Sequence, residues 1–202
     1  MVSRAAEPVL LGFLRHGEVA GAAHVYRGRS DAPLTQHGLR QMHDALTALP
    51  PWGAIVSSPA RRCLDFAHVI AAERRIDCTI DADWHELDFG AWENLQPAEA
   101  ALRDVEAHAA FVRDPRRHPP PGGETLDALD ARVSAALARL GDTARTSTLV
   151  VTHAGAMRAV LAQVLGLPDS HRARIALTPG SHFVVSWLAG APPLLTALQC
   201  AD

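Results

Sequence analysis

Residues 9–18 read V-L-L-G-F-L-R-H-G-E, an apolar run that ends in an arginine, a histidine and a glycine. Residues 149–155 read L-V-V-T-H-A-G, and there a second apolar run ends at a histidine. Each run has the length and the aliphatic content of a strand that is buried on both faces. Ligands of parallel α/β sheets bind in the crevice at the carboxyl ends of the strands. The two runs therefore predict that His16 and His153 point into one crevice.

Predicted strands and helices alternate along the rest of the chain. The predicted strands cover residues 9–14, 53–57, 78–80, 174–177, 182–188 and 194–198, together with a strand that ends at His153. The predicted helices cover residues 35–49 behind a Thr35 cap, a segment from Pro59 behind a Ser58 cap, and residues 97–113, 125–140 and 156–165. This alternation is typical of an α/β fold: a three-layer sandwich with a mostly parallel central sheet.

The chain length favours a single domain. A chain of 202 residues is ample for one sizeable core and short for two. We expect residues 1–202 to form one domain, in which residues 85–123 are a small cap-like insertion of helix and loop over the sheet edge. Residues 115–123, rich in proline and glycine, are the clearest loop. Such segments often cover a binding site.

The bulk composition argues against several functions. The net charge of −3 gives no global basic field for nucleic acid. The 3 cysteines are widely spaced and form no C-x-x-C pair, which favours a reducing cytoplasm. The apolar run before Arg15 is too short for a secretion signal or a membrane span, and no H-E-x-x-H spacing indicates a metal site. We therefore expect a cytoplasmic protein without a metal, another cofactor, a nucleic-acid partner or a membrane partner.

Five motifs in a fixed order carry a family resemblance. They are L-R-H-G-E (14–18), D-A-P-L-T (31–35), S-S-P-A-R-R (57–62), H-E-L-D-F-G-A-W-E (85–93) and V-V-T-H-A-G-A-M-R (150–158). With this order and spacing the chain resembles the histidine phosphatase (phosphoglycerate mutase-like) superfamily. The stretches E-L-D-F-G-A-W-E and R-H-P-P-P-G-G-E (117–124) resemble most the bacterial α-ribazole phosphatases, which act late in cobalamin assembly.

The resemblance implies a nucleophile and a charge clamp. His16 matches the histidine that forms a phosphoramidate with the transferred group, and its position at a strand end supports this role independently. A neutral imidazole is a competent nucleophile near neutral pH. Arg15 and Arg62 match the phosphate-binding arginines, whose planar forks suit phosphate oxygens.

The remaining motifs imply a second histidine and an acid. His153 would donate a hydrogen bond to the phosphoryl oxygens, and the helix start at Ala154 would add backbone donors. Glu86 would protonate the leaving oxygen and then activate the hydrolytic water. By composition alone Glu86 is a surface carboxylate beside Asp88. The E-L-x-F-G context of the family favours Glu86 over Asp88.

Several weaker candidates surround this set. Gly28 matches a position where the family closes over the phosphate, and its N–H is expected there. Arg27 or Arg29 would reach the substrate or lie in a solvated loop. Many family members carry an asparagine on the phosphate where this chain has Ala22. His182, near the start of a late strand, could lie close to the crevice.

These expectations combine into one predicted function. The chain is interpreted as a metal-independent phosphomonoester hydrolase with a phosphohistidine intermediate, acting on a small phosphorylated metabolite such as α-ribazole 5′-phosphate, as a monomer or homodimer. The alternatives are a phosphoglycerate mutase, a broad-specificity phosphatase and a non-catalytic phospho-ligand binder. A mutase usually has a longer and more basic insertion than residues 85–123. A non-catalytic relative would lack the nucleophile or the acid.

Overall fold

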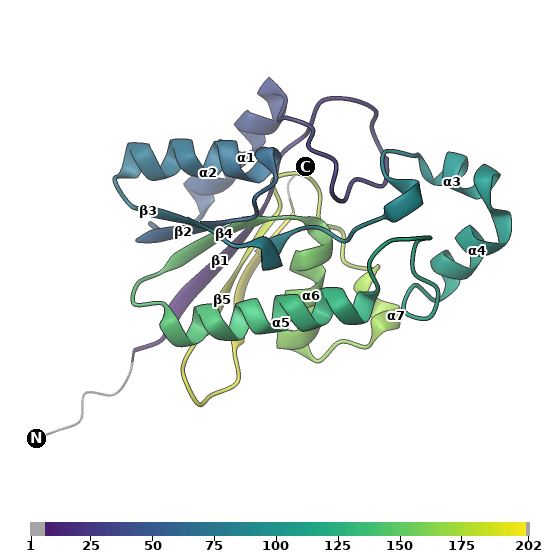
Figure 1. Cartoon of the computed structure of the whole chain (residues 1–202). Helices are drawn as coiled ribbons and strands as arrows, with labels where there is room; N and C mark the ends of the chain where they lie inside the picture. Colours follow the sequence, from purple (N-terminus) through teal and green to yellow (C-terminus); the bar gives the residue numbers. More distant parts are fainter. Residues whose placement is uncertain (1–6, 201–202) are drawn as a thin grey trace, which may run out of the picture.

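A six-stranded sheet lies at the centre of the computed structural model, which describes residues 7–200 (Figure 1). The strands run in the order β3-β2-β4-β1-β5-β6. Their bounds are Val9–Arg15 (β1), Ala54–Ser57 (β2), Asp77–Ile80 (β3), Thr148–Thr152 (β4), His182–Trp187 (β5) and Leu194–Gln199 (β6). Strands β1, β4, β2 and β3 are mutually parallel, whereas β5 is antiparallel to β1 and β6 is antiparallel to β5. Because Arg15 pairs with Thr152 in register, β1 and β4 end side by side.

Helices cover both faces of the sheet and make it the middle of three layers (Figure 1). Helices α1 (Gln36–Ala48) and α2 (Arg61–Arg74) pack on one face, and α5 (Leu126–Thr143) and α6 (Ala154–Leu165) pack on the other. On β1, Phe13 belongs to the core under α5 and α6, and Leu14 belongs to the core under α1 and α2. Both side chains are fully buried, and each such burial stabilises the fold by roughly 1.5–3 kcal/mol. The predicted three-layer α/β architecture and the two-sided burial of β1 are confirmed.

Of the two predicted helix caps, Thr35 holds and Ser58 fails, and Thr125 is a further cap that the sequence analysis did not predict. The Thr35 hydroxyl accepts from the Gly38 N–H at 2.9 Å, and the Thr125 hydroxyl accepts from the Ala128 N–H at 3.1 Å. The prediction for α2 is wrong, because this helix begins at Arg61 behind Ala60. Ser58 does not cap it, since its hydroxyl bonds the ring of His153.

Three further boundaries differ from the predictions. Residues 97–113 form two helices, α3 (Pro97–Arg103) and α4 (Val105–Arg113), because Asp104 adopts an extended conformation and its carboxylate caps α4. Residues 174–177 form no strand: the carbonyl groups of Ile175 and Leu177 accept from arginine side chains instead of a β-ladder. The short helix α7 (Asp169–Arg172) precedes them, and α6 begins at residue 154 rather than 156.

The segment 85–123 extends beyond the ends of the strands and carries α3 and α4 (Figure 1). Two 3₁₀ turns, Ala82–Trp84 and Gly90–Trp92, lie before α3. Tyr26, in the loop after β1, exchanges backbone hydrogen bonds with Asn94 and Leu95 at 2.8 and 2.9 Å. This pairing fixes the loop after β1 against the segment 85–123. No helix in residues 7–200 is both long enough and apolar enough to span a membrane.

Candidate active site

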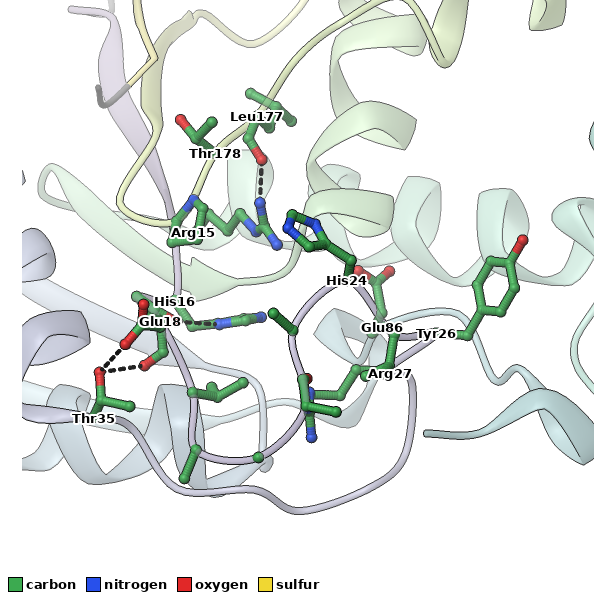
Figure 2. Close-up of a pocket in the computed structure, with 18 of the residues that line it drawn as sticks. Arg15, His16, Glu18, His24, Tyr26, Arg27, Thr35, Glu86, Leu177 and Thr178 are labelled. Carbon is green, nitrogen blue, oxygen red and sulfur yellow. Dashed lines mark hydrogen bonds between the residues drawn. The ribbon is translucent and has the colours of Figure 1, made fainter. Parts of the chain in front are cut away.

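A cavity of about 810 Å³ opens at the carboxyl end of β1 (Figure 2). Its wall combines Arg15 and His16 with residues 17–27, Glu86, Phe89 and residues 176–179. Arg62 and His153 are fully buried and lie behind this wall, and the rings of His16 and His153 are 5.2 Å apart between centroids. The sheet therefore brings the two predicted histidines together, with His16 facing the cavity and His153 behind it.

The His16 ring is held in one tautomer. Its Nδ1 lies 2.8 Å from the carbonyl oxygen of Gly17, and a carbonyl only accepts, so Nδ1 carries the hydrogen. Nε2 therefore has the free lone pair. Burial lowers the pKa of His16 well below its usual value, and the positive charges of Arg15 and Arg62 lower it further. A neutral ring with a free Nε2 at the cavity wall suits a nucleophile.

Arg15 offers an unused donor beside His16. Its Nη1 donates to the carbonyl of Leu177, while its Nε is buried and has no hydrogen-bond partner among residues 7–200. Burial lowers the pKa of Arg15, although the negative charge of Glu86 opposes this shift. A partly buried cation with a buried, unpaired N–H favours binding of an anion. Arg15 thus lines the cavity beside His16, and its role in binding phosphate stays a prediction.

Arg62 is turned toward neutral groups of the protein. Its Nη1 donates to the Ser30 carbonyl at 2.6 Å, its Nη2 donates to the Gly28 carbonyl at 2.7 Å, and its Nε donates to the His153 ring at 3.3 Å. None of these three partners is charged, so they leave the positive charge of the guanidinium uncompensated at the site. Arg62 therefore adds positive potential from one layer behind the cavity wall.

Both nitrogens of His153 have partners inside the protein. Because Arg62 can only donate, His153 Nδ1 is an acceptor, and Nε2 carries the hydrogen toward the Ser58 hydroxyl at 2.8 Å. Burial is the main reason that the pKa of His153 lies well below its usual value. This geometry differs from the expected donation to phosphoryl oxygens. For that donation, Nε2 has to exchange its bond to Ser58 for a bond to the phosphoryl group.

Glu86 is one of two carboxylates that line the cavity, and the other is Glu18, whose Oε1 accepts from the Thr35 hydroxyl at 2.8 Å. Glu86 Oε2 accepts from the Gly155 N–H at 3.0 Å, and Glu86 Oε1 accepts from its own neighbour Leu87 at 2.9 Å. Gly155 follows Ala154, the buried first residue of α6, so the helix start holds the carboxylate. Asp88 instead binds the Gly90 N–H at 2.8 Å and is absent from the cavity wall. Of the two carboxylates of the motif, only Glu86 lines the cavity, and its role as the acid stays a prediction.

The loop after β1 differs from the expectation at Gly28. The Gly28 N–H donates to the carboxylate of Glu93, at 3.1 and 3.2 Å to its two oxygens, and does not face the cavity. Arg27 does line the cavity, where it donates to the Ala22 carbonyl at 2.9 Å. The Arg29 side chain lies 4.0 Å from Asp88. Ala22 also lines the cavity, and its methyl group cannot replace an asparagine amide.

Sequence reasoning missed several residues of the wall. His24 lines the cavity with a φ of 55°, a left-handed conformation that is rare outside glycine and often marks functional sites (Figure 2). The Tyr26 hydroxyl bonds the His108 ring at 2.9 Å and so joins the cavity wall to α4. The tyrosine beside Arg27 was the only sequence signal for this link. His182 is buried on β5 opposite Leu14 and lines no part of the cavity.

Metal ligands do not cluster in the described chain. Within residues 7–200, no group of three or more histidine, cysteine, aspartate or glutamate side chains is arranged to hold a metal ion. Positive charge at the cavity comes from the guanidinium groups of Arg15, on the wall, and of Arg62, which is fully buried behind it.

Comparisons with known proteins agree on the family. Residues 11–197 match the model of the histidine phosphatase superfamily (branch 1). The bifunctional protein Rv2228c of Mycobacterium tuberculosis is 36% identical over 178 residues, which are 86% of this chain and 46% of that protein. This chain therefore spans about half the length of that mycobacterial relative.

Other relatives match along most of their length. The adenosylcobalamin/alpha-ribazole phosphatase of Escherichia coli is 28% identical over 78% of this chain and 80% of its own. A probable phosphoglycerate mutase, GpmB of Salmonella paratyphi C, is 32% identical over 81% of this chain and 78% of its own. The crystal structure of a putative alpha-ribazole-5′-P phosphatase from E. coli superposes with a TM-score of 0.84 at 25% identity, covering 94% of this chain and 95% of that one.

Proposed function

Since this chain belongs to the histidine phosphatase superfamily (branch 1), whose members are phosphatases or mutases, we propose that it hydrolyses small phosphomonoesters through a phosphohistidine on His16. The observation that carries the proposal is the His16 ring, whose Nδ1 is bound to the Gly17 carbonyl and whose Nε2 is free beside Arg15 and Glu86. Nucleophile, cation and acid thus share one cavity wall.

The first step transfers the phosphoryl group to the enzyme. The lone pair of His16 Nε2 attacks phosphorus, an N–P bond forms, and the ester P–O bond breaks with its electrons going to the leaving oxygen. Protonated Glu86 gives its proton to that oxygen, so an alcohol departs. The buried charges of Arg15 and Arg62 stabilise the phosphoryl oxygens during transfer.

The second step returns the enzyme to its starting state. The Glu86 carboxylate takes a proton from a water molecule, whose oxygen attacks phosphorus and displaces Nε2. The N–P electrons return to the ring as its lone pair, inorganic phosphate leaves, and Glu86 is again protonated. The low pKa of His16 favours this return to a neutral ring.

The cavity wall supports hydrolysis over mutase chemistry. A mutase has to retain a bisphosphate, which needs a second cationic site. Arg15 and Arg27 are the arginines of the wall, which has no lysine, and residues 19–23 contribute mainly small apolar groups. We therefore favour a monophosphate ester with an uncharged remainder. The substrate named for the E. coli relatives, α-ribazole 5′-phosphate, has this character and is our specific proposal.

A trapping experiment tests the mechanism. Wild-type protein quenched during turnover of p-nitrophenyl phosphate should carry an acid-labile, base-stable phosphoryl group on His16, and His16→Ala should carry none. Near wild-type turnover by His16→Ala would refute the mechanism. Phosphate binding without any turnover by the wild type would instead indicate a non-catalytic relative.

A substrate panel tests the specificity. Wild-type protein should hydrolyse α-ribazole 5′-phosphate with a higher kcat/KM than other phosphomonoesters, and it should not interconvert phosphoglycerates when 2,3-bisphosphoglycerate is present. Mutase activity, the second candidate given the GpmB similarity, would overturn the substrate assignment and keep the phosphohistidine. Equal rates across the panel would indicate a broad-specificity phosphatase.

A further inference from the structure

A carboxylate that the proposed mechanism does not use joins two segments of the site. Glu93 accepts hydrogen bonds from three consecutive N–H groups of the loop after β1: Gly28 at 3.1 Å, Arg29 at 2.9 Å and Ser30 at 3.2 Å. The Phe89 N–H donates to the same carboxylate at 3.1 Å. Hydrogen bonds to an ionised acceptor are roughly twice as strong as neutral ones. Glu93 therefore fixes the backbone of residues 28–30.

The same loop binds Arg62 through its carbonyl groups. Arg62 donates to the Gly28 carbonyl at 2.7 Å, while the Arg29 N–H donates to Glu93 at 2.9 Å. The Gly28 carbonyl and the Arg29 N–H belong to a single peptide group. One peptide unit thus connects the carboxylate of Glu93 to the guanidinium of Arg62. Hydrogen bonds in such a chain polarise and strengthen one another.

The packing around this peptide leaves little freedom. A Cβ atom at Gly28 would lie 2.3 Å from Glu93 Oε1 and 2.1 Å from the Leu87 carbonyl oxygen, so only glycine fits. Arg62 has no exposed surface, so water cannot replace a carbonyl partner that moves away. If the loop moves, the Arg62 guanidinium therefore has to move with it.

We propose that Glu93 is a positioning residue for phosphoryl transfer, which sets the place and direction of the Arg62 guanidinium through the peptide between residues 28 and 29. Glu93 is absent from the cavity wall, so in this proposal it acts through Arg62 and not on the substrate itself. The proposal rests on the phosphatase function proposed above, in which Arg62 supplies charge to the phosphoryl group. The charge of Arg62 also lowers the pKa of His16 and of His153, so its placement affects both rings.

A double-mutant cycle tests this coupling. Glu93→Gln keeps the size of the side chain but turns an NH₂ group toward the loop N–H donors. With p-nitrophenyl phosphate, we expect Glu93→Gln to lower kcat/KM about 10-fold and to raise the inhibition constant of inorganic phosphate by a similar factor. In an Arg62→Met background, adding Glu93→Gln should cost less than about twofold, because residues that act through one contact are non-additive.

Controls separate positioning from general stability. Glu99 also accepts a backbone N–H, from Gln96 at 2.7 Å, but it lies on α3 and has no link to Arg62, so Glu99→Gln should stay within about twofold of wild type. Urea denaturation should show that each variant is folded. If Glu93→Gln does not fold, Glu93→Asp, which keeps the charge but shortens the reach, replaces it in the cycle.

Two results would overturn the proposal: an unchanged kcat/KM in the Glu93 variant, or an equal loss with and without Arg62. Calorimetric titration with inorganic phosphate provides a readout that does not require turnover. A wild type that binds phosphate without hydrolysing esters would refute the proposed function, and the cycle measured on phosphate affinity would still test the role of Glu93.

Discussion

Replacing Gly155 with alanine should displace the general acid without removing it. A Cβ atom at this position would lie 2.0 Å from Glu86 Oε1, whereas contacts below 3.0 Å essentially do not occur. The carboxylate therefore has to retreat by about 1 Å, and its hydrogen bond to the Gly155 N–H is disturbed. A misplacement of about 1 Å can cost roughly 10²-fold in rate, or about 2.7 kcal/mol.

The loss should depend on the leaving group. We expect Gly155→Ala to lower kcat about 10²-fold for an alkyl phosphate such as glycerol phosphate. The loss should be much smaller for p-nitrophenyl phosphate, whose leaving group departs with little protonation. The helix itself should tolerate the change, because alanine favours helices by about 1 kcal/mol over glycine.

The assay compares Gly155→Ala, Glu86→Gln and the double variant on both substrates. Because both changes act on one carboxylate, the double variant should be no slower than Glu86→Gln alone. Thermal unfolding checks that all three proteins are folded. An alkyl-phosphate rate within about threefold of wild type would refute the reasoning, as would equal losses on the two substrates.

Three further predictions follow from the same geometry. Glu86→Gln should lower the rate on an alkyl phosphate by about 10²–10⁴-fold, and Asp88→Asn should lower it far less. A larger loss in Asp88→Asn would assign the acid to Asp88. Because the pKa of His16 is lowered, its ring stays neutral as the pH falls through 6.5. We therefore expect kcat/KM, corrected for ionisation of the substrate, to stay constant down to about pH 6. A fall in kcat/KM with a midpoint near about pH 6.5–7 would contradict this. EDTA should leave activity unchanged, because Arg15 and Arg62 supply the charge and the described residues contain no cluster of metal ligands. Loss of activity in EDTA, with full restoration by Mg²⁺ or Zn²⁺, would contradict this.

Local sequence signals predicted most of the framework. The apolar runs before His16 and after Ser147 indicated strands buried on both faces, and the side chains of β1 do belong to two different cores. Thr35 caps its helix as expected, because a cap depends only on residues a few positions away. The strand-end rule also places His16 at the crevice from the sequence alone, although its role as the nucleophile was implied by the family motifs.

The same local reasoning failed where distant groups compete for a polar atom. Ser58 precedes a proline at a helix start and fits a cap, but its hydroxyl binds His153, 95 positions away. Residues 174–177 fit a strand by composition, yet their carbonyls satisfy Arg15 and Arg158. In both cases a buried donor from another element outweighed the local preference, since leaving it unpaired would cost about 1–3 kcal/mol.

The sequence by itself determined the layered α/β fold, the family and the motif residues of the site, because apolar periodicity and short motifs are properties of neighbouring positions. Only the tertiary structure decided how these residues divide their hydrogen bonds. It directs the Gly28 N–H to Glu93, places Arg62 behind the cavity wall and pairs both nitrogens of His153. These bonds join segments that are far apart in the chain, and folding brings them within reach only when the sheet and the segment 85–123 come together.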